Sequence, residues 1–181
     1  MKKLVFSILM CVATISAKAQ ILTSEIINNI YEAVSNQSDG DFVFNADKSG
    51  SNITSMYVYK KVCNSQNIVT LIPHRKYDYA YAADGTLISR IIYHWSENQA
   101  EWTSAARYDF TLADGKYNIE YSRYKPLAQA FDQPVEKMVY TLLPDDSADY
   151  VCCYHRNRPS SPFQLVSETY IGSEPLLMAR K

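Results

Sequence analysis

Two short segments of this chain repeat one pattern, and that repeat constrains the fold more than any other feature. Lys-Tyr-Asp-Tyr at 76–79 and Arg-Tyr-Asp-Phe at 107–110 alternate charged and aromatic side chains, and each precedes an Asp-Gly pair, at 84–85 and 114–115. Alternation with a period of two places successive side chains on opposite faces of a strand, and Asp-Gly is a strong hairpin signal. The repeat therefore predicts two β-hairpins.

The same alternation continues through most of the chain. Tyrosine, isoleucine and valine fall in short runs separated by turn residues, which is typical of antiparallel strands. The strands expected from these runs are 55–63, 67–73, 75–82, 87–95, 102–112, 116–124, 136–143, 149–156 and 163–171. We expect a mainly β fold: an antiparallel meander of hairpins forming a curved sheet, a two-layer sandwich or an open barrel.

One short helix is expected near the N-terminus. Ile26, Ile27 and Ile30 have helical spacing within residues 24–34, and Ser24 is available as the cap. The polar stretch that follows, up to residue 52, predicts a loop with at most one edge strand. The chain is thus divided into a signal peptide at 1–19, a helix and loop at 20–54, and a tyrosine-rich β domain at 55–181.

The two Asp-Gly turns differ by one residue, and this difference sets the strand register. In the first hairpin a three-residue loop at 83–85, with Gly85 left-handed, pairs Tyr81 with Leu87 and Tyr77 with Ile91. In the second hairpin a two-residue loop at 114–115 pairs Leu112 with Tyr117, Phe110 with Ile119 and Tyr108 with Tyr121.

This register sorts the side chains onto two faces. The expected apolar face holds Tyr77, Tyr79, Tyr81, Leu87, Ile91, Tyr93, Trp95, Trp102, Tyr108, Phe110, Leu112, Tyr117, Ile119 and Tyr121, with Trp95 opposite Trp102. The other face holds Asp78, Arg90, Arg107, Asp109 and Glu120. Strands from 136 to 171, as a second layer or a closed barrel, are favoured over the helix as the cover of the rings.

The first residues have the form of a secretory signal peptide. Lys2 and Lys3 precede a short apolar run at 4–15, and Ala-Lys-Ala at 17–19 precedes Gln20. A run this short is below the about 20 residues of a membrane-spanning helix. We expect cleavage near Ala19–Gln20, a periplasmic or extracellular location, and no membrane span in the mature chain.

Composition limits the partners. The formal net charge of −1 gives no basic surface for nucleic acid. No glycine-rich phosphate loop or Gly-x-Ser-x-Gly motif occurs, and the three histidines, His74, His94 and His155, have no metal-ligand spacing. No cofactor, metal or catalytic residue is expected.

Three cysteines follow the signal peptide. Cys63 could bridge Cys152 or Cys153, leaving one free thiol, or no bridge forms. Cys152 and Cys153 would point to opposite faces of a strand, so at most one of them could meet Cys63.

Two resemblances agree with the hairpins. Residues 81–87 resemble the tyrosine-aspartate (YD/Rhs-type) repeats of large bacterial surface proteins, although Ala82 replaces the usual aspartate. A second set of residues spans 77–124: Tyr77-Asp-Tyr79, Gly85-Thr-Leu87, Arg90, Tyr93-His-Trp95, Trp102, Arg107-Tyr108-Asp-Phe110 and Glu120-Tyr-Ser-Arg-Tyr124. On these residues the chain resembles a family of small exported Bacteroidales proteins, domain of unknown function 3836. The resemblance implies export and a β meander, and it brings no catalytic residue.

Two surface features are candidates for function. Asp109 and Glu120 face each other across the second hairpin, at a spacing that retaining glycosidases use, but nearby arginines favour an ion-pair network instead. The chain has 15 tyrosines and only 6 phenylalanines. Because each buried phenol needs a hydrogen-bond partner, part of the aromatic surface is expected to remain exposed to solvent. Our main prediction is a non-catalytic module that binds a glycan or protein through Tyr93, Trp95, Trp102 and Tyr124. A structural or assembly protein is the alternative, and a glycan-active enzyme comes third.

Overall fold

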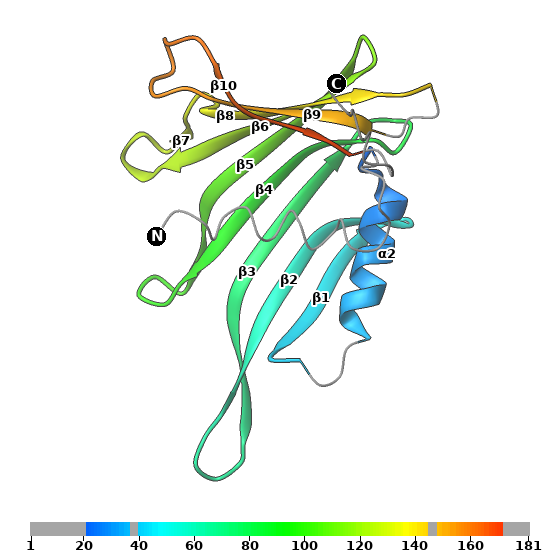
Figure 1. The fold of residues 1–181 in the computed structure, drawn as a ribbon. Coiled ribbons are helices and arrows are strands. Elements are labelled where there is room, and N and C mark those ends of the chain that lie inside the picture. The colour runs from blue at the N-terminus through cyan, green and yellow to red at the C-terminus, as the bar shows by residue number, and fades with distance from the viewer. Residues whose placement is uncertain (1–20, 37–39, 145–147, 172–181) are drawn as a thin grey trace, which may run out of the picture.

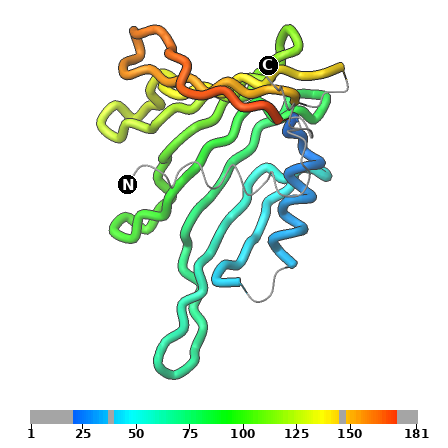
Figure 2. The backbone as a smooth tube through the Cα atoms, in the orientation of Figure 1, coloured from blue at the N-terminus to red at the C-terminus, as the bar shows by residue number. Residues whose placement is uncertain are grey.

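The computed structural model describes residues 21–36, 40–144 and 148–171. The predicted signal peptide at 1–19 lies outside the described residues. In this part of the chain, one helix, α2 (Ser24–Ser35), precedes a single ten-stranded antiparallel sheet (Figures 1 and 2). The strands are β1 (Phe42–Ser49), β2 (Asn52–Cys63), β3 (Val69–Tyr81), β4 (Leu87–Ser96), β5 (Glu101–Ala113), β6 (Lys116–Lys125), β7 (Ala130–Phe131), β8 (Glu136–Leu142), β9 (Ala148–His155) and β10 (Gln164–Tyr170), with a 3-10 turn at Pro126–Ala128.

The strands follow one another across the sheet in the order β1-β2-β3-β4-β5-β6-β8-β9-β10, and β7 pairs with β6. The predicted antiparallel meander is confirmed, and it forms a curved open sheet. The two strands expected at 67–73 and 75–82 are one strand, β3. His74 is the residue left unpaired at a bulge between the pairs Val58↔Arg75 and Tyr59↔Pro73, so the expected break is a local irregularity of a continuous strand.

Both hairpin turns have the predicted geometry. Tyr81 pairs with Leu87 around a loop whose Gly85 has φ +85°. Asp114 and Gly115 have φ +53° and +67° and form a two-residue turn. All three pairs predicted for the second hairpin are observed, as is Trp95 opposite Trp102.

The helix begins at the first hairpin turn. Its cap is Thr23, whose hydroxyl accepts a hydrogen bond from the Ile26 N–H at 3.3 Å, and not Ser24 as predicted. Thr23 also forms a β-bridge with Thr86, and the Ser24 N–H donates to the Gly85 carbonyl at 2.9 Å. The helix start is therefore fixed to the turn between β3 and β4.

We call the side of the sheet on which α2 packs the helix face, and the opposite side the outer face. Ile27 of α2 is buried against Ile53, Met56, Val58 and Tyr77. A second buried cluster on the helix face contains Leu87, Phe110, Tyr117 and Ile119, with Ile21 and Leu22 packed against it. The predicted facing is confirmed for part of the set. On the helix face lie Tyr77, Tyr79, Tyr108, Phe110, Ile119 and Tyr121, and on the outer face lie Asp78, Asp109 and Glu120.

Two bulges correct the predicted faces in β4 and at the start of β5. Ala80 pairs with Ser89 and Tyr81 with Leu87, so Ile88 is unpaired and Tyr77 meets Ile92 instead of Ile91. The extra residue reverses the facing of β4 beyond it. Arg90 consequently lies on the helix face, and Ile91, Tyr93 and Trp95 lie on the outer face. In β5 the unpaired residue is Ala105, and this second bulge places Trp102 on the outer face as well.

The predicted cover of the rings is also corrected. The strands from 136 to 171 do not form a second layer or close a barrel; β8, β9 and β10 continue the sheet beyond β6. The helix covers β1 and β2, and Figure 1 shows it lying along that side of the sheet. Ile21 and Leu22, just before the helix, pack on the second cluster.

Candidate functional site

The two tryptophans form the centre of an aromatic patch on the outer face. Trp95 and Trp102 are opposite each other across the β4–β5 hairpin, with ring centroids 5.1 Å apart in an edge-to-face arrangement. The Tyr57 ring lies 6.2 Å from the Trp102 ring, and Tyr93 shares a face with Trp95 two residues along β4. Because Tyr57 is on β2 and Trp102 on β5, their side chains reach across β3 and β4.

We define the aromatic patch as Tyr57, Tyr93, Trp95 and Trp102. All four side chains are half-buried, which is the state expected of large rings that pack against one another on an otherwise open sheet face. Such rings offer apolar area at low entropic cost and retain polar edges. The patch can therefore stack on a partner and also hydrogen-bond to it.

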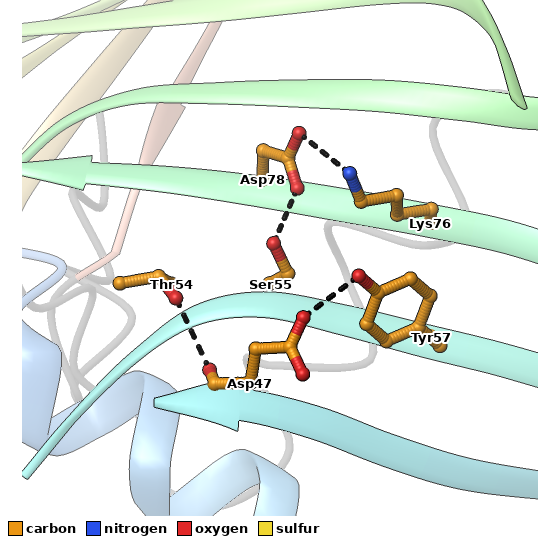
Figure 3. A network of polar contacts seen from close by, with 6 residues as sticks. All are labelled: Asp47, Thr54, Ser55, Tyr57, Lys76 and Asp78. Carbon is orange, nitrogen blue, oxygen red and sulfur yellow. Dashed lines mark hydrogen bonds and ion pairs between the residues drawn. The ribbon is translucent and has the colours of Figure 1, made fainter. Parts of the chain in front are cut away.

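Polar groups lie beside the patch, and Figure 3 shows those around Tyr57. The Lys76 Nζ lies 5.6 Å from the Tyr57 ring centroid and 5.0 Å from that of Tyr93, and it forms an ion pair with Asp78 at 3.1 Å. Ser55 Oγ donates to the same carboxylate at 2.7 Å. A cation over two rings and beside a carboxylate is held by both interactions.

A second carboxylate holds the tyrosine at the edge of the patch. The Tyr57 hydroxyl donates to an Asp47 carboxylate oxygen at 2.8 Å, and Thr54 Oγ1 donates to the Asp47 carbonyl at 3.3 Å. The hydrogen bond to Asp47, followed by burial, raises the pKa of Tyr57. Burial, followed by a hydrogen bond to Asp78, raises the pKa of Tyr93 to about 12. Both phenols are neutral donors at physiological pH.

Three of the four residues predicted for binding come together, and one does not. Tyr93, Trp95 and Trp102 belong to the aromatic patch, whereas the Tyr124 ring packs on Phe131 of β7, with centroids 5.3 Å apart. Sequence reasoning missed Tyr57 and Lys76. Lys76 opens the first repeat, and alternation within the predicted strand 55–63 could have placed Tyr57 beside it.

The carboxylate pair predicted as a catalytic alternative is engaged by cations. Asp109 and Glu120 face each other on the outer face, but Arg107 binds Asp109 at 2.8 Å and Lys137 lies 3.7 Å from Glu120. This is the predicted ion-pair network with one correction: Arg90 is not part of it. The Arg90 guanidinium is buried on the helix face, 4.7 Å from the Tyr108 ring centroid.

The cysteines form no bridge in the structure. Cys63, Cys152 and Cys153 are all free thiols. Five strands separate β2, which ends at Cys63, from β9, which holds the other two, whereas a disulfide needs Cα atoms within about 7 Å. Of the two alternatives that the sequence leaves open, the one without a Cys63 bridge describes this structure.

The histidines lie on different parts of the sheet. His74 packs on Phe42 with ring centroids 5.3 Å apart, His94 is on β4 and His155 is on β9. Within the described residues, no group of three histidine, cysteine, aspartate or glutamate side chains is placed to hold a metal ion.

Comparisons with known proteins give a family and a fold. The sequence model described as "Family of unknown function (DUF3836)" matches residues 1–142. A crystal structure of a protein of unknown function from Bacteroides fragilis NCTC 9343 is 19% identical, covers 73% of this chain and 93% of its own, and has a TM-score of 0.62. No curated protein matches the chain.

Two structures of DUF3836 family proteins are also similar. The one from Bacteroides vulgatus ATCC 8482 is 15% identical and covers 60% of this chain and 97% of its own; the one from Parabacteroides distasonis ATCC 8503 is 16% identical and covers 56% and 90%. Each has a TM-score of 0.47.

Proposed function

We propose that this chain, which belongs to the DUF3836 family of unknown function, is an exported, non-catalytic module that binds a glycan on the outer face of its sheet. The observation that carries the proposal is the meeting of Tyr57, Trp95 and Trp102, from three different strands, away from the helix-face core. Burying such rings is not needed to complete that core. Their clustering is better explained by a bound partner.

The polar groups around the rings favour a neutral sugar chain. The Lys76 charge is compensated by Asp78 at 3.1 Å, so the patch offers no free cation to an acidic glycan. Carboxylates and phenols remain as acceptors and donors for sugar hydroxyls, while the apolar faces of sugar rings can stack on the indoles. A protein partner would also contact the rings. It would be favoured over a glycan if the wild-type protein binds none of the hexasaccharides in the test below.

Export is proposed on the N-terminal sequence. The lysine pair, short apolar run and Ala-Lys-Ala site favour a cleaved signal peptide and a periplasmic or extracellular location. In the described part of the chain, no helix combines the length and apolar character of a membrane span.

The test is affinity electrophoresis and calorimetry with hexasaccharides of glucose, xylose, mannose and N-acetylglucosamine. We expect at least one of them to bind, and Trp95→Ala and Trp102→Ala each to weaken binding at least tenfold. Tyr124→Ala is the matched control, since it removes a ring from the same face that packs on Phe131 instead. Wild-type protein that binds no hexasaccharide, or variants that bind as wild type does, would refute a glycan site here.

A second candidate function rests on β10. This strand is last in the sheet order and all seven of its residues are exposed, so within the described residues one edge of the sheet has unpaired backbone groups. An assembly protein could add a neighbouring strand there. Light scattering that shows a concentration-dependent oligomer, abolished by Val166→Lys, would favour this function over glycan binding.

A further inference from the structure

A cavity of about 430 Å³ lies on the helix face, on the opposite side of the sheet from the aromatic patch. It is formed by β5, β6, β8, β9 and β10, whereas α2 packs on β1 and β2. Cavities of roughly 300–1,000 Å³ are the usual size of small-molecule sites. This cavity is separate from the proposed glycan site and has a different chemistry.

The cavity has aromatic and aliphatic walls. Tyr108 of β5 and Tyr121 of β6 are opposite each other with ring centroids 5.2 Å apart, and Ile119 of β6 pairs with Met138 of β8. Both phenol rings are only half-buried, although they lie on the face that holds the core. Both rings line the cavity.

One carboxylate at this wall has no ion-pair partner, since Lys137, which also lines the cavity, lies 3.7 Å from Glu120 on the outer face instead. Glu136 lines the cavity and is directly opposite Tyr121. His155, its neighbour on β9, lines the same cavity but forms no ion pair with it, and within the described residues no lysine or arginine does so either. Three carboxylates on the outer face, Asp78, Asp109 and Glu120, differ in this respect, because each has a cation.

The buried cation on this face, Arg90, does not form an ion pair with Glu136. The Arg90 guanidinium lies 4.7 Å from the Tyr108 ring centroid and 6.0 Å from that of Tyr77, between the two rings. Four residues on neighbouring strands form a row across the sheet, in the order Arg90, Tyr108, Tyr121 and Glu136. Arg90 and Glu136 are therefore at opposite ends of the row, separated by the two tyrosines. The cavity side of this row thus presents ring faces and a negative charge, and both attract cations.

We infer that this cavity binds a small organic amine, with its apolar body against Tyr108, Ile119 and Met138 and its ammonium group against Glu136 and the Tyr121 ring. An anion of the same size is rejected by the carboxylate. A neutral analogue fits the walls but lacks the charge-assisted hydrogen bond.

The first experiment is calorimetry with 2-phenylethylamine, 2-phenylethanol and 3-phenylpropionate. The amine is expected to bind at least tenfold more tightly than the alcohol, and the acid not to bind. Glu136→Gln should remove the preference for the amine, while Glu120→Gln, which changes a carboxylate on the other face of the adjacent strand, should keep it. Equal binding of amine and acid would overturn the inference.

A second measurement uses the native thiols and needs no variant. Cys153 lines the cavity, Cys152 points to the outer face, and Cys63 is exposed at the far end of β2. Saturating 2-phenylethylamine should slow alkylation of Cys153 by iodoacetamide at least fivefold and leave the other two unchanged. Equal rates with and without the amine would show that the cavity is not its site. Trp102→Ala should leave this protection intact, so failure here is distinguishable from failure of the glycan proposal.

Discussion

Replacing Gly85 with alanine is expected to destabilise the protein by about 2 kcal/mol, roughly twice the effect of the same change at Gly115. Both glycines end the Asp-Gly turns and have positive φ, +85° and +67°. A left-handed conformation costs an alanine about 1–2 kcal/mol, and reduced freedom of the unfolded chain returns about 0.4–1 kcal/mol. The net loss is about 1 kcal/mol at Gly115, where an added Cβ would meet no atom within 4 Å.

The substitution at Gly85 has a further cost in stability, because the first residue of α2, Ser24, contacts this glycine. An added Cβ would come within 3.2 Å of Ser24 Oγ, and the Ser24 N–H donates to the Gly85 carbonyl at 2.9 Å. Moving Ser24 away weakens that hydrogen bond, which contributes about 1 kcal/mol. The turn and the helix are therefore coupled at Gly85 and not at Gly115.

Urea and thermal unfolding of the two variants test this coupling. A difference of about 1 kcal/mol corresponds to roughly 2–4 °C in Tm for a chain of this size. Adding Ser24→Ala should reduce the loss caused by Gly85→Ala and leave Gly115→Ala unaffected. Equal losses at the two glycines, or no effect of Ser24→Ala, would show that the helix start does not rest on the turn.

Three further predictions follow from the tyrosines and the thiols. Tyr81→Phe should cost about 1–2 kcal/mol, because its hydroxyl donates to the carbonyl of the fully buried Ile53 at 2.9 Å; urea unfolding should show almost no change for the exposed Tyr170→Phe. Burial raises the pKa of Tyr81 to about 12, and burial together with a hydrogen bond to Asp78 raises the pKa of Tyr93 to about 12. The unfolded chain therefore loses these protons at lower pH than the folded protein, and the free energy of unfolding should fall between pH 10 and 12. Urea midpoints that are the same at pH 9 and pH 11 would contradict this. Reductant should not alter Tm, and denatured unreduced protein should react with thiol reagent at Cys63, Cys152 and Cys153.

Local turn chemistry explains how much of the fold could be predicted. Asp-Gly at 114–115 selects a two-residue turn, and this fixed every pair of the second hairpin up to Tyr108 with Tyr121. The turn at Gly85 was equally predictable. The signal is strong because few residues tolerate positive φ, and a turn sets the register of both strands that leave it.

Bulges explain most of what could not be predicted. Nothing about Ile88 or Ala105 marks it as an unpaired residue, yet the first reverses the facing of Arg90 and Trp95. The sequence therefore predicted that Trp95 meets Trp102 but placed the pair on the wrong face. The error matters for function, since it is the outer face that makes the two indoles available to a partner.

The aromatic patch and the cavity differ in how much of each can be predicted from local sequence. Trp95 and Trp102 are joined by a short hairpin, so their contact follows from the turn. Tyr57 joins them only through the register of β2 with β3, which contains the bulge at His74. The cavity near Glu136 is lined by five strands at once, from β5 to β10, and no pattern within one strand or one turn specifies it.

The central claim, that the aromatic patch binds a glycan, is tested most directly by tryptophan fluorescence. The chain has two tryptophans, Trp95 and Trp102, and both belong to the patch, so their emission reports on this site alone. Titration with the hexasaccharide that binds in calorimetry should shift the emission and saturate at the calorimetric Kd. A hexasaccharide that binds in calorimetry while tryptophan emission stays unchanged would contradict the account, because the sugar would then be held elsewhere.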